Sequence, residues 1–393
     1  MRVVGIIAEY NPFHQGHALQ LAEAKRKSEA DYAVVVMSGA VTQRGVFARH
    51  DKFLRTRAAL MGGADLVLEL PVRFACAPAP DFARGGTALL AALGVVTHLS
   101  FGCEPEAIGR LSAAAAFLRE ESLPYKEALH AAMDRGLSWP AASMQALNAV
   151  TGEDWSCLAN PNAVLALEYL RHLRGMEPVP VARQGERYDS LKLSRLASAS
   201  AIRHALEEGR MEEAYAALPY PTLFRQAEDA GHVHLPDSLD RVLLARLRRM
   251  KSEEIAELYG VDEGIEHAFA AAARKAGTRD ALIALVKSRR YTWARLSRVC
   301  TCALLGFTKD FAAESAAPAY ARILGFRKSA QPLLHAVRVA SSVPLVAKCA
   351  DFDREQPQMA MDLLAQDLWA LGCAAPDARG AGLDFTTSPV IEP

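Results

Sequence analysis

The chain has 393 residues, of which 51% are hydrophobic and 23% are charged, and its 45 Lys and Arg residues balance its 45 Asp and Glu residues. These proportions are ordinary for a soluble globular protein, and the length predicts two or three domains. The sequence excludes a membrane protein, because no apolar run reaches the roughly 18 residues that a span requires and no signal peptide precedes the first expected strand.

The cysteines favour a reduced protein. There are seven, an odd number, and they are scattered without a C-x-x-C pair. This pattern predicts a cytoplasmic protein with no disulfide framework and no zinc site. Cys300 and Cys302 are interpreted as small buried residues rather than metal ligands.

Strand-like and helical segments alternate through the first half of the chain. Residues 3–8 form an apolar run rich in β-branched side chains, typical of a strand buried on both faces, and an amphipathic stretch follows at 18–27. Further apolar runs lie at 32–37, 65–70 and 94–101, with helical stretches between them. The alternation predicts a parallel sheet covered by helices on both faces, with ligands at the carboxyl ends of the strands.

The loop after the first strand carries the sequence N-P-F-H-Q-G-H at residues 11–17. His14 and His17 flank Gly16 immediately before the first helix, where free N–H groups and the helix dipole attract anions. We therefore predict a phosphate site here. The alternatives are polar loop histidines or a zinc pair, for which no third ligand is apparent.

A second helix start lies at residues 198–203, with the sequence S-A-S-A-I-R. Ser198 or Ser200 can cap the helix that carries Arg203, and hydroxyls beside a guanidinium form a second anion cradle. The alternative is an ordinary helix cap.

The second half of the chain is predicted to be mostly helical and locally basic. One basic stretch covers residues 241–251, and the other covers 281–300, which has no acidic residue and includes Tyr291 and Trp293. Cations beside aromatic rings suit an RNA backbone whose bases stack on the rings, although a solvated helix face is the alternative. We expect a surface role for Arg44 and Lys52, and a loop from residue 374 onward.

These motifs together resemble a known family. E-Y-N-P-F-H-Q-G-H at 9–17, M-S-G at 37–39, Q-R-G at 43–45 and F-G-C-E at 101–104 are followed by P-N at 161–162, S-A-S-A-I-R at 198–203 and K-S-R-R-Y-T at 287–292. Their order resembles that of the bacterial tRNA(Met) cytidine acetate ligases, within the superfamily of nucleotidyltransferases with an H-x-G-H motif. The resemblance covers most of the chain.

The resemblance implies an α/β fold with a Rossmann-like parallel sheet of the nucleotidyltransferase type. Residues 1–220 would form the ATP-binding catalytic domain, with a helical insertion at about 105–152. Residues 221–393 would form a mainly helical, basic tRNA-binding domain.

The implied activity has two steps. ATP activates acetate to acetyl-adenylate, and the acetyl group then passes to the wobble cytidine of elongator tRNA(Met), forming N4-acetylcytidine without acetyl-CoA. We expect Mg²⁺ to accompany ATP through phosphate oxygens and water, with no dedicated protein metal site. The alternatives are a small-molecule adenylyltransferase and a non-catalytic RNA-binding protein on the same scaffold.

The resemblance also implies site residues. The catalytic residues would be His14, His17 and Arg203. The ATP contacts would be Ile7, Ala8, Glu9, Tyr10, Asn11, Pro12, Phe13, His14, Gln15, Gly16, His17, Ala18, Leu19, Gln20, Gly102, Asn162, Arg183, Ser200 and Arg203. The basic stretch at 281–300 itself predicts the tRNA contacts, which are Lys287, Arg289, Arg290, Arg295 and Arg298.

Some positions depart from the family pattern. Asn160 competes with Asn162, because the sequence here reads A-N-P-N, and Ser200 replaces the usual threonine but keeps the hydroxyl. Ala163 and Ala166 stand where relatives often have polar or glycine residues, which affects the adenosine pocket. Backbone N–H groups at 39–45 are expected to bound the acetate pocket.

Overall fold

A computed structural model describes residues 1–104, 107–182, 193–194, 196–262 and 264–393. Arg183, one of the expected ATP contacts, lies outside the described residues.

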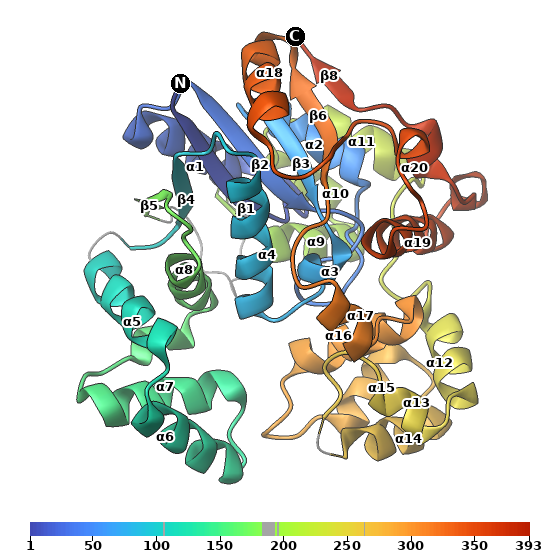
Figure 1. The fold of residues 1–393 in the computed structure, drawn as a ribbon. Coiled ribbons are helices and arrows are strands. Elements are labelled where there is room, and N and C mark those ends of the chain that lie inside the picture. The colour runs from blue at the N-terminus through green and yellow to red at the C-terminus, as the bar shows by residue number, and fades with distance from the viewer. Residues whose placement is uncertain (105–106, 183–192, 195, 263) are drawn as a thin grey trace.

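An eight-stranded sheet runs through the centre of the molecule in the order β5-β4-β1-β2-β3-β6-β7, with β8 paired to β6 (Figure 1). Strands β1 to β5 pair with one another in parallel. The predicted α/β class with a mostly parallel sheet is therefore confirmed. The strands are β1 (Val3–Ala8), β2 (Tyr32–Ser38), β3 (Leu66–Leu70), β4 (His98–Gly102), β5 (Glu177–Val181), β6 (Ala321–Arg327), β7 (Leu345–Val346) and β8 (Val390–Glu392).

Helices cover both faces of this sheet, because alternate strand residues point to opposite sides. Val34 and Val36 of β2 pack in one core cluster with α4 (Ala79–Ala92), while Val35 and Met37 pack in the other with α1 (Gln15–Ser28). The remaining helices near the sheet are α2 (Lys52–Met61), α3 (Val72–Ala75), α8 (Pro161–Arg171), α9 (Ala199–Glu207), α10 (Met211–Ala216), α18 (Gln331–Ala340), α19 (Pro357–Leu371) and α20 (Leu383–Thr386). Short 3-10 turns lie at Ser156–Ala159, Lys328–Ala330, Cys349–Asp351 and Pro376–Arg379.

Two helical groups extend from the same end of the sheet, at the lower left and lower right of Figure 1. The first is α5 (Ile108–Glu120), α6 (Leu123–Asp134) and α7 (Trp139–Thr151), which lie between β4 and β5 in the chain where a helical insertion was expected. The second has its own apolar core and consists of α12 (Asp240–Arg249), α13 (Ser252–Ala256), α14 (Ile265–Lys275), α15 (Arg279–Val286) and α16 (Trp293–Leu305). Helices α11 (Pro221–Asp229) and α17 (Lys309–Glu314) flank this second group in the chain.

The C-terminal part of the chain returns to the sheet, which the sequence did not predict. Strand β6 pairs antiparallel with β3, and β7 and β8 pair parallel with β6. The sheet therefore draws strands from both sides of residue 220 and is not purely parallel. The segment after residue 374, expected to be loop, contains α20 and β8.

None of the helices in the described ranges is both long enough and apolar enough to cross a membrane.

Candidate active site

A cavity of about 290 Å³ lies at the carboxyl ends of β1, β4 and β5. Strand β1 lies between β2 and β4 in the sheet. The chain runs from β1 to β2 on one side of β1 and later to β4 on its other side, so the cavity lies where the strand order reverses. The predicted ATP contacts that line it are Ile7, Ala8, Glu9, Tyr10, Asn11, His14, Gly16, His17, Leu19, Gln20, Gly102, Asn162 and Arg203. Pro12, Phe13, Gln15, Ala18 and Ser200 are not among the residues that line it.

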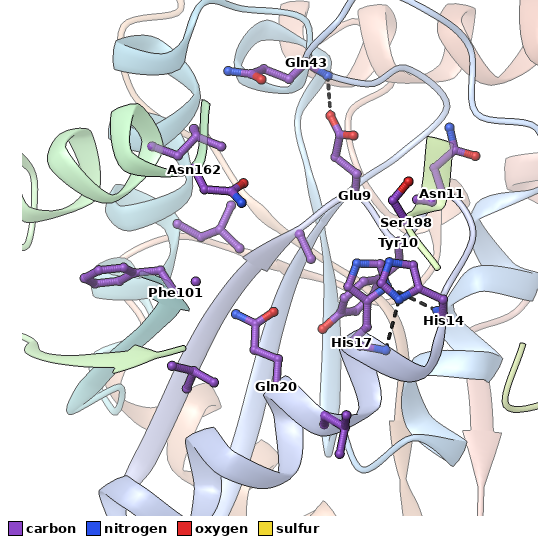
Figure 2. Close-up of a pocket in the computed structure, with 18 of the residues that line it drawn as sticks. Glu9, Tyr10, Asn11, His14, His17, Gln20, Gln43, Phe101, Asn162 and Ser198 are labelled. Atoms are coloured by element: carbon purple, nitrogen blue, oxygen red, sulfur yellow. Dashed lines mark hydrogen bonds between the residues drawn. The ribbon is translucent and has the colours of Figure 1, made fainter. Parts of the chain in front are cut away.

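The two histidines lie side by side at the start of α1 (Figure 2), with ring centroids 3.6 Å apart. The Gly16 amide donates to Nδ1 of His14 at 3.1 Å, and the His14 amide donates to Nδ1 of His17 at 3.2 Å. A neutral imidazole whose Nδ1 accepts a hydrogen bond carries its proton on Nε2. The loop therefore fixes both rings in the tautomer that offers an Nε2–H donor, which suits a phosphate oxygen.

Buried aromatic side chains pack against this loop on the side that faces the core. Phe13 is fully buried, and its ring meets that of Tyr10 edge-on at 4.9 Å, while the Tyr10 ring lies 4.6 Å from that of His17. Burial raises the pKa of Tyr10, so its hydroxyl stays neutral. Phe13 thus packs behind the histidines in the core and does not line the cavity, and its expected contact with ATP stays a prediction.

Arg203 brings the two predicted anion cradles together. Ser198 caps α9 by accepting a hydrogen bond from the Ala201 amide at 3.1 Å. Arg203 donates through Nη2 to the Ser200 hydroxyl at 3.3 Å and through Nη1 to the Asn11 carbonyl. The two serines thus have different contacts, one in the helix cap and the other with the guanidinium.

The opposite side of the cavity carries Phe101 and Asn162 (Figure 2). Asn160 caps α8 and accepts a hydrogen bond from the Asn162 amide at 3.0 Å, while Asn162 itself lines the cavity. This placement favours Asn162 over Asn160 as the residue that contacts a nucleotide.

Arg55 is a structural residue of the site that the sequence reasoning missed. It is fully buried on α2 and donates to the carbonyls of Glu9 at 2.7 Å and Ser38 at 2.9 Å, and also to that of Gly39. Burial lowers its pKa to about 10, so the guanidinium remains charged at neutral pH. Arg55 therefore ties the ends of β1 and β2 together; its place in the first turn of α2, after the loop that follows β2, was the available signal.

A buried charge cluster, formed by Lys52, Glu69, Arg322 and Asp384, lies beside the site. Lys52 is 1% exposed and contacts Glu69 at 2.8 Å and Asp384 at 2.9 Å, so the expected surface role of Lys52 is wrong. Arg322 contacts the same two carboxylates at 2.9 and 2.8 Å. A Cβ atom on Gly39 would lie 1.9 Å from Glu69, which explains the glycine at the end of β2.

The five basic residues assigned to RNA differ in exposure and in their contacts within the protein. Lys287 and Arg289 are exposed, and Arg290 is half-buried. Arg295 contacts Asp262 at 3.0 Å and covers the Tyr291 ring, and Arg298 donates to the Gln43 carbonyl at 3.2 Å. The last two side chains therefore hold α16 in place, and Arg298 does so against the loop beside the cavity.

Within the described ranges, no group of three or more His, Cys, Asp or Glu residues is placed to hold a metal ion. The seven cysteines are free thiols, and Cys157 is the exposed one.

The sequence and fold have close relatives. A family model described as HIGH nucleotidyl transferase matches residues 1–381. A tRNA(Met) cytidine acetate ligase from Syntrophomonas wolfei is 35% identical over 99% of each chain, and one from Bacillus velezensis is 36% identical over 96% of this chain and 94% of its own.

Solved structures agree over the full length. The crystal structure of Thermotoga maritima TmcAL bound with alpha-thio ATP superposes with a TM-score of 0.93, at 30% identity and with 100% of both chains covered. The apo structure of the same protein gives a TM-score of 0.94 with the same coverage. The chain belongs to the tRNA(Met) cytidine acetate ligase family of HIGH nucleotidyltransferases.

Proposed function

We propose that this protein activates acetate with ATP and transfers the acetyl group to the wobble cytidine of elongator tRNA(Met), forming N4-acetylcytidine. The observation that carries the proposal is the pair of Nε2–H donors of His14 and His17, which line one cavity with Arg203 in a chain matched over its full length by this family.

In the first step, an oxygen of acetate attacks the α-phosphorus of ATP. The bond from that phosphorus to the bridging oxygen breaks, and pyrophosphate leaves with the electron pair. His14 and His17 stabilise the negative charge on the phosphoryl oxygens, and Arg203 holds the leaving pyrophosphate. Mg²⁺ bound with ATP would neutralise part of the phosphate charge, and it would be held by phosphate oxygens and water rather than by a set of protein side chains.

In the second step, the cytidine N4 attacks the acetyl carbonyl carbon. The carbon–oxygen bond to the phosphate breaks, AMP leaves, and N4 gives up one proton to the surrounding solvent. An anticodon loop presents its bases in single-stranded form, so the attacking amine is accessible. The ATP chemistry is assigned to residues 1–220, and tRNA binding to the basic helices that follow. We infer a cytoplasmic location, because ATP and tRNA are both present there.

The test is to incubate the protein with ATP, labelled acetate and total tRNA. We expect label in tRNA, dependent on ATP, and no incorporation when labelled acetyl-CoA replaces acetate and ATP. Label that stays with a nucleotide would indicate a small-molecule adenylyltransferase, and tRNA binding without any labelled product would indicate a non-catalytic RNA-binding protein. Either outcome would overturn the proposal.

A further inference from the structure

A second cavity, of about 340 Å³, adjoins the first. Its walls come from α9, α12, α16 and the segment 44–49, so it lies between the catalytic part and the helical group α12–α16. Arg44 and Arg203 line both cavities. A group bound in the second cavity is therefore next to Arg203, to which the proposed function assigns the leaving pyrophosphate.

The lining of the second cavity suits a flat heterocycle. Trp293, the first residue of α16, is 44% exposed and lines the cavity with apolar side chains that include Leu243 and Leu304. Stacking on an aromatic ring is the main way in which proteins hold unpaired bases. Arginine donors at the wall shared with the first cavity fit the acceptor atoms O2 and N3 of cytosine.

The charges in the lining are mixed. Glu207 and Asp240 place carboxylates in a wall that also carries Arg44, Arg203 and Arg279, and the charge of Arg49 is already paired with Glu228 at 2.6 Å. A neutral base tolerates such a mixed lining, whereas the two carboxylates offset part of the attraction that the arginines exert on a polyanion.

The partition between the two cavities is held rigidly. The Gly45 carbonyl accepts hydrogen bonds from Ser297 Oγ at 3.0 Å and Thr301 Oγ1 at 2.7 Å, and also from Arg279. Gly45 has φ +68°, and a Cβ atom there would lie 2.4 Å from the backbone of Arg298. Helix α16 therefore fixes the loop that carries Arg44, and with it the position of one cavity relative to the other.

We propose that the second cavity receives the acceptor nucleobase of the tRNA, which stacks on Trp293 and directs its amine toward the acetyl-adenylate in the first cavity. This inference rests on the proposed function and adds the place and the aromatic residue that hold the acceptor. Arg44 and Arg203 form the shared wall, so the base lies beside Arg203 once pyrophosphate has left.

The decisive variant is Trp293→Ala, matched by Trp139→Ala on α7, where Trp139 is 36% exposed. We expect Trp293→Ala to lower kcat/KM for tRNA acetylation about tenfold to a hundredfold, the range expected for loss of one base–aromatic stack. Acetate-dependent ATP–pyrophosphate exchange should stay within about twofold of the wild type, because tRNA takes no part in that step. Trp293→Phe should restore most of the acetylation, and Trp139→Ala should match the wild type.

A fluorescence titration tests the stack directly. The other tryptophans, Trp155 and Trp369, are 2% and 3% exposed. In a Trp139→Phe background, an anticodon stem-loop with the wobble cytidine should quench emission, and a stem-loop that is abasic at that position should not. Trp293→Phe should remove the quenching.

The outcomes separate the two proposals. Wild-type protein that never acetylates tRNA would overturn the proposed function. Wild-type acetylation by Trp293→Ala, or equal quenching by the abasic stem-loop, would overturn only the acceptor cavity. A parallel loss of exchange and acetylation in Trp293→Ala would also overturn it, because the residue would then support the fold or the ATP site.

Discussion

Two groups of charged or polar side chains near the ends of β1 to β3 are satisfied in different ways. In the buried charge cluster, each cation contacts both carboxylates at 2.8 to 2.9 Å. At the candidate active site, His14, His17 and Arg203 are held by a backbone carbonyl, backbone amides and a hydroxyl, and they line a cavity. Opposite charges within the protein neutralise the first group, while under the proposed function the second group meets the phosphates of ATP.

The difference separates structural charge from functional charge. A buried ion pair gains little overall stability, but removal of one partner leaves an expensive uncompensated charge. Donors fixed around a cavity contribute to the reaction instead, because they stabilise charge that appears only on the substrate. We therefore expect substitutions in the first group to change unfolding and those in the second to change rate.

The largest effect is expected for Glu69→Ala. Loss of this carboxylate leaves Lys52 and Arg322 buried with Asp384 alone, and the free energy of unfolding should fall by about 3–5 kcal/mol. Denaturant unfolding measures the change. Glu355→Ala, which removes an exposed partner of Arg354, is the control and should change it by less than about 1 kcal/mol. Equal effects of the two changes would contradict the structural role of the cluster.

The second effect is expected for His17→Ala in the catalytic cavity. Acetate-dependent ATP–pyrophosphate exchange should fall about 10²- to 10³-fold, because one preorganised donor to the transferring phosphoryl group is lost. Stability should change little by comparison with Glu69→Ala. His267→Ala, whose side chain is 72% exposed on α14, is the control. Undiminished exchange would exclude His17 from charge stabilisation.

Glu168→Gln tests a buried carboxylate without a close partner. Glu168 is 1% exposed, its nearest cation, Arg171, is 3.8 Å away, and burial raises its pKa from 4.5 to about 7. Because the folded-state pKa is the higher one, the stability from this group is fully present below pH 4.5 and is lost as the pH rises through 7.

Glu168→Gln should therefore gain stability relative to the wild type between pH 5 and pH 8, by on the order of 1–3 kcal/mol. Unfolding at both pH values measures the gain. Glu127→Gln, exposed on α6, should follow the wild type at each pH. A pH-independent difference for Glu168→Gln would refute the raised pKa.

The smallest effect is expected for Arg289→Ala combined with Arg290→Ala. Binding of tRNA should weaken about tenfold at low salt. The slope of the logarithm of the binding constant against the logarithm of the salt concentration should become shallower by about one unit for each phosphate that the variant no longer neutralises. ATP–pyrophosphate exchange should be intact, and Arg354→Ala should bind tRNA normally. Wild-type binding by the double variant at several salt concentrations would show that this stretch is only a solvated surface.

Local patterns made the first strand, the histidine loop and the cap of α9 predictable from sequence. The apolar run of β1, the short polar loop and the S-A-S-A-I-R helix start each depend on residues only a few positions apart. A cavity at the carboxyl ends of the strands was likewise expected from the parallel sheet, and the structure has one there. The elements around the candidate site could therefore be predicted before their contacts were known.

Contacts between distant parts of the chain could not be predicted in this way. Lys52 looks like a surface residue because its partner Asp384 lies 332 positions away, in a segment whose composition is typical of a loop. The antiparallel pairing of β6 with β3 follows from the same distant contacts. A distant contact of the basic stretch could not be predicted either, since Arg298 donates a hydrogen bond to the carbonyl of Gln43, 255 positions earlier.

The return of β6 to the sheet has a consequence for synthesis on the ribosome. Residues 66–70 of β3 emerge about 250 residues before their partner strand, so one edge of the sheet stays unpaired while the helical group is made. An unpaired edge strand recruits other chains, which makes this interval the aggregation-prone stage of biogenesis. Lys52 and Glu69 are made before Arg322 and Asp384, so the buried charge cluster is incomplete during this interval. Synthesis of β6, which carries Arg322, then allows the edge of β3 to pair.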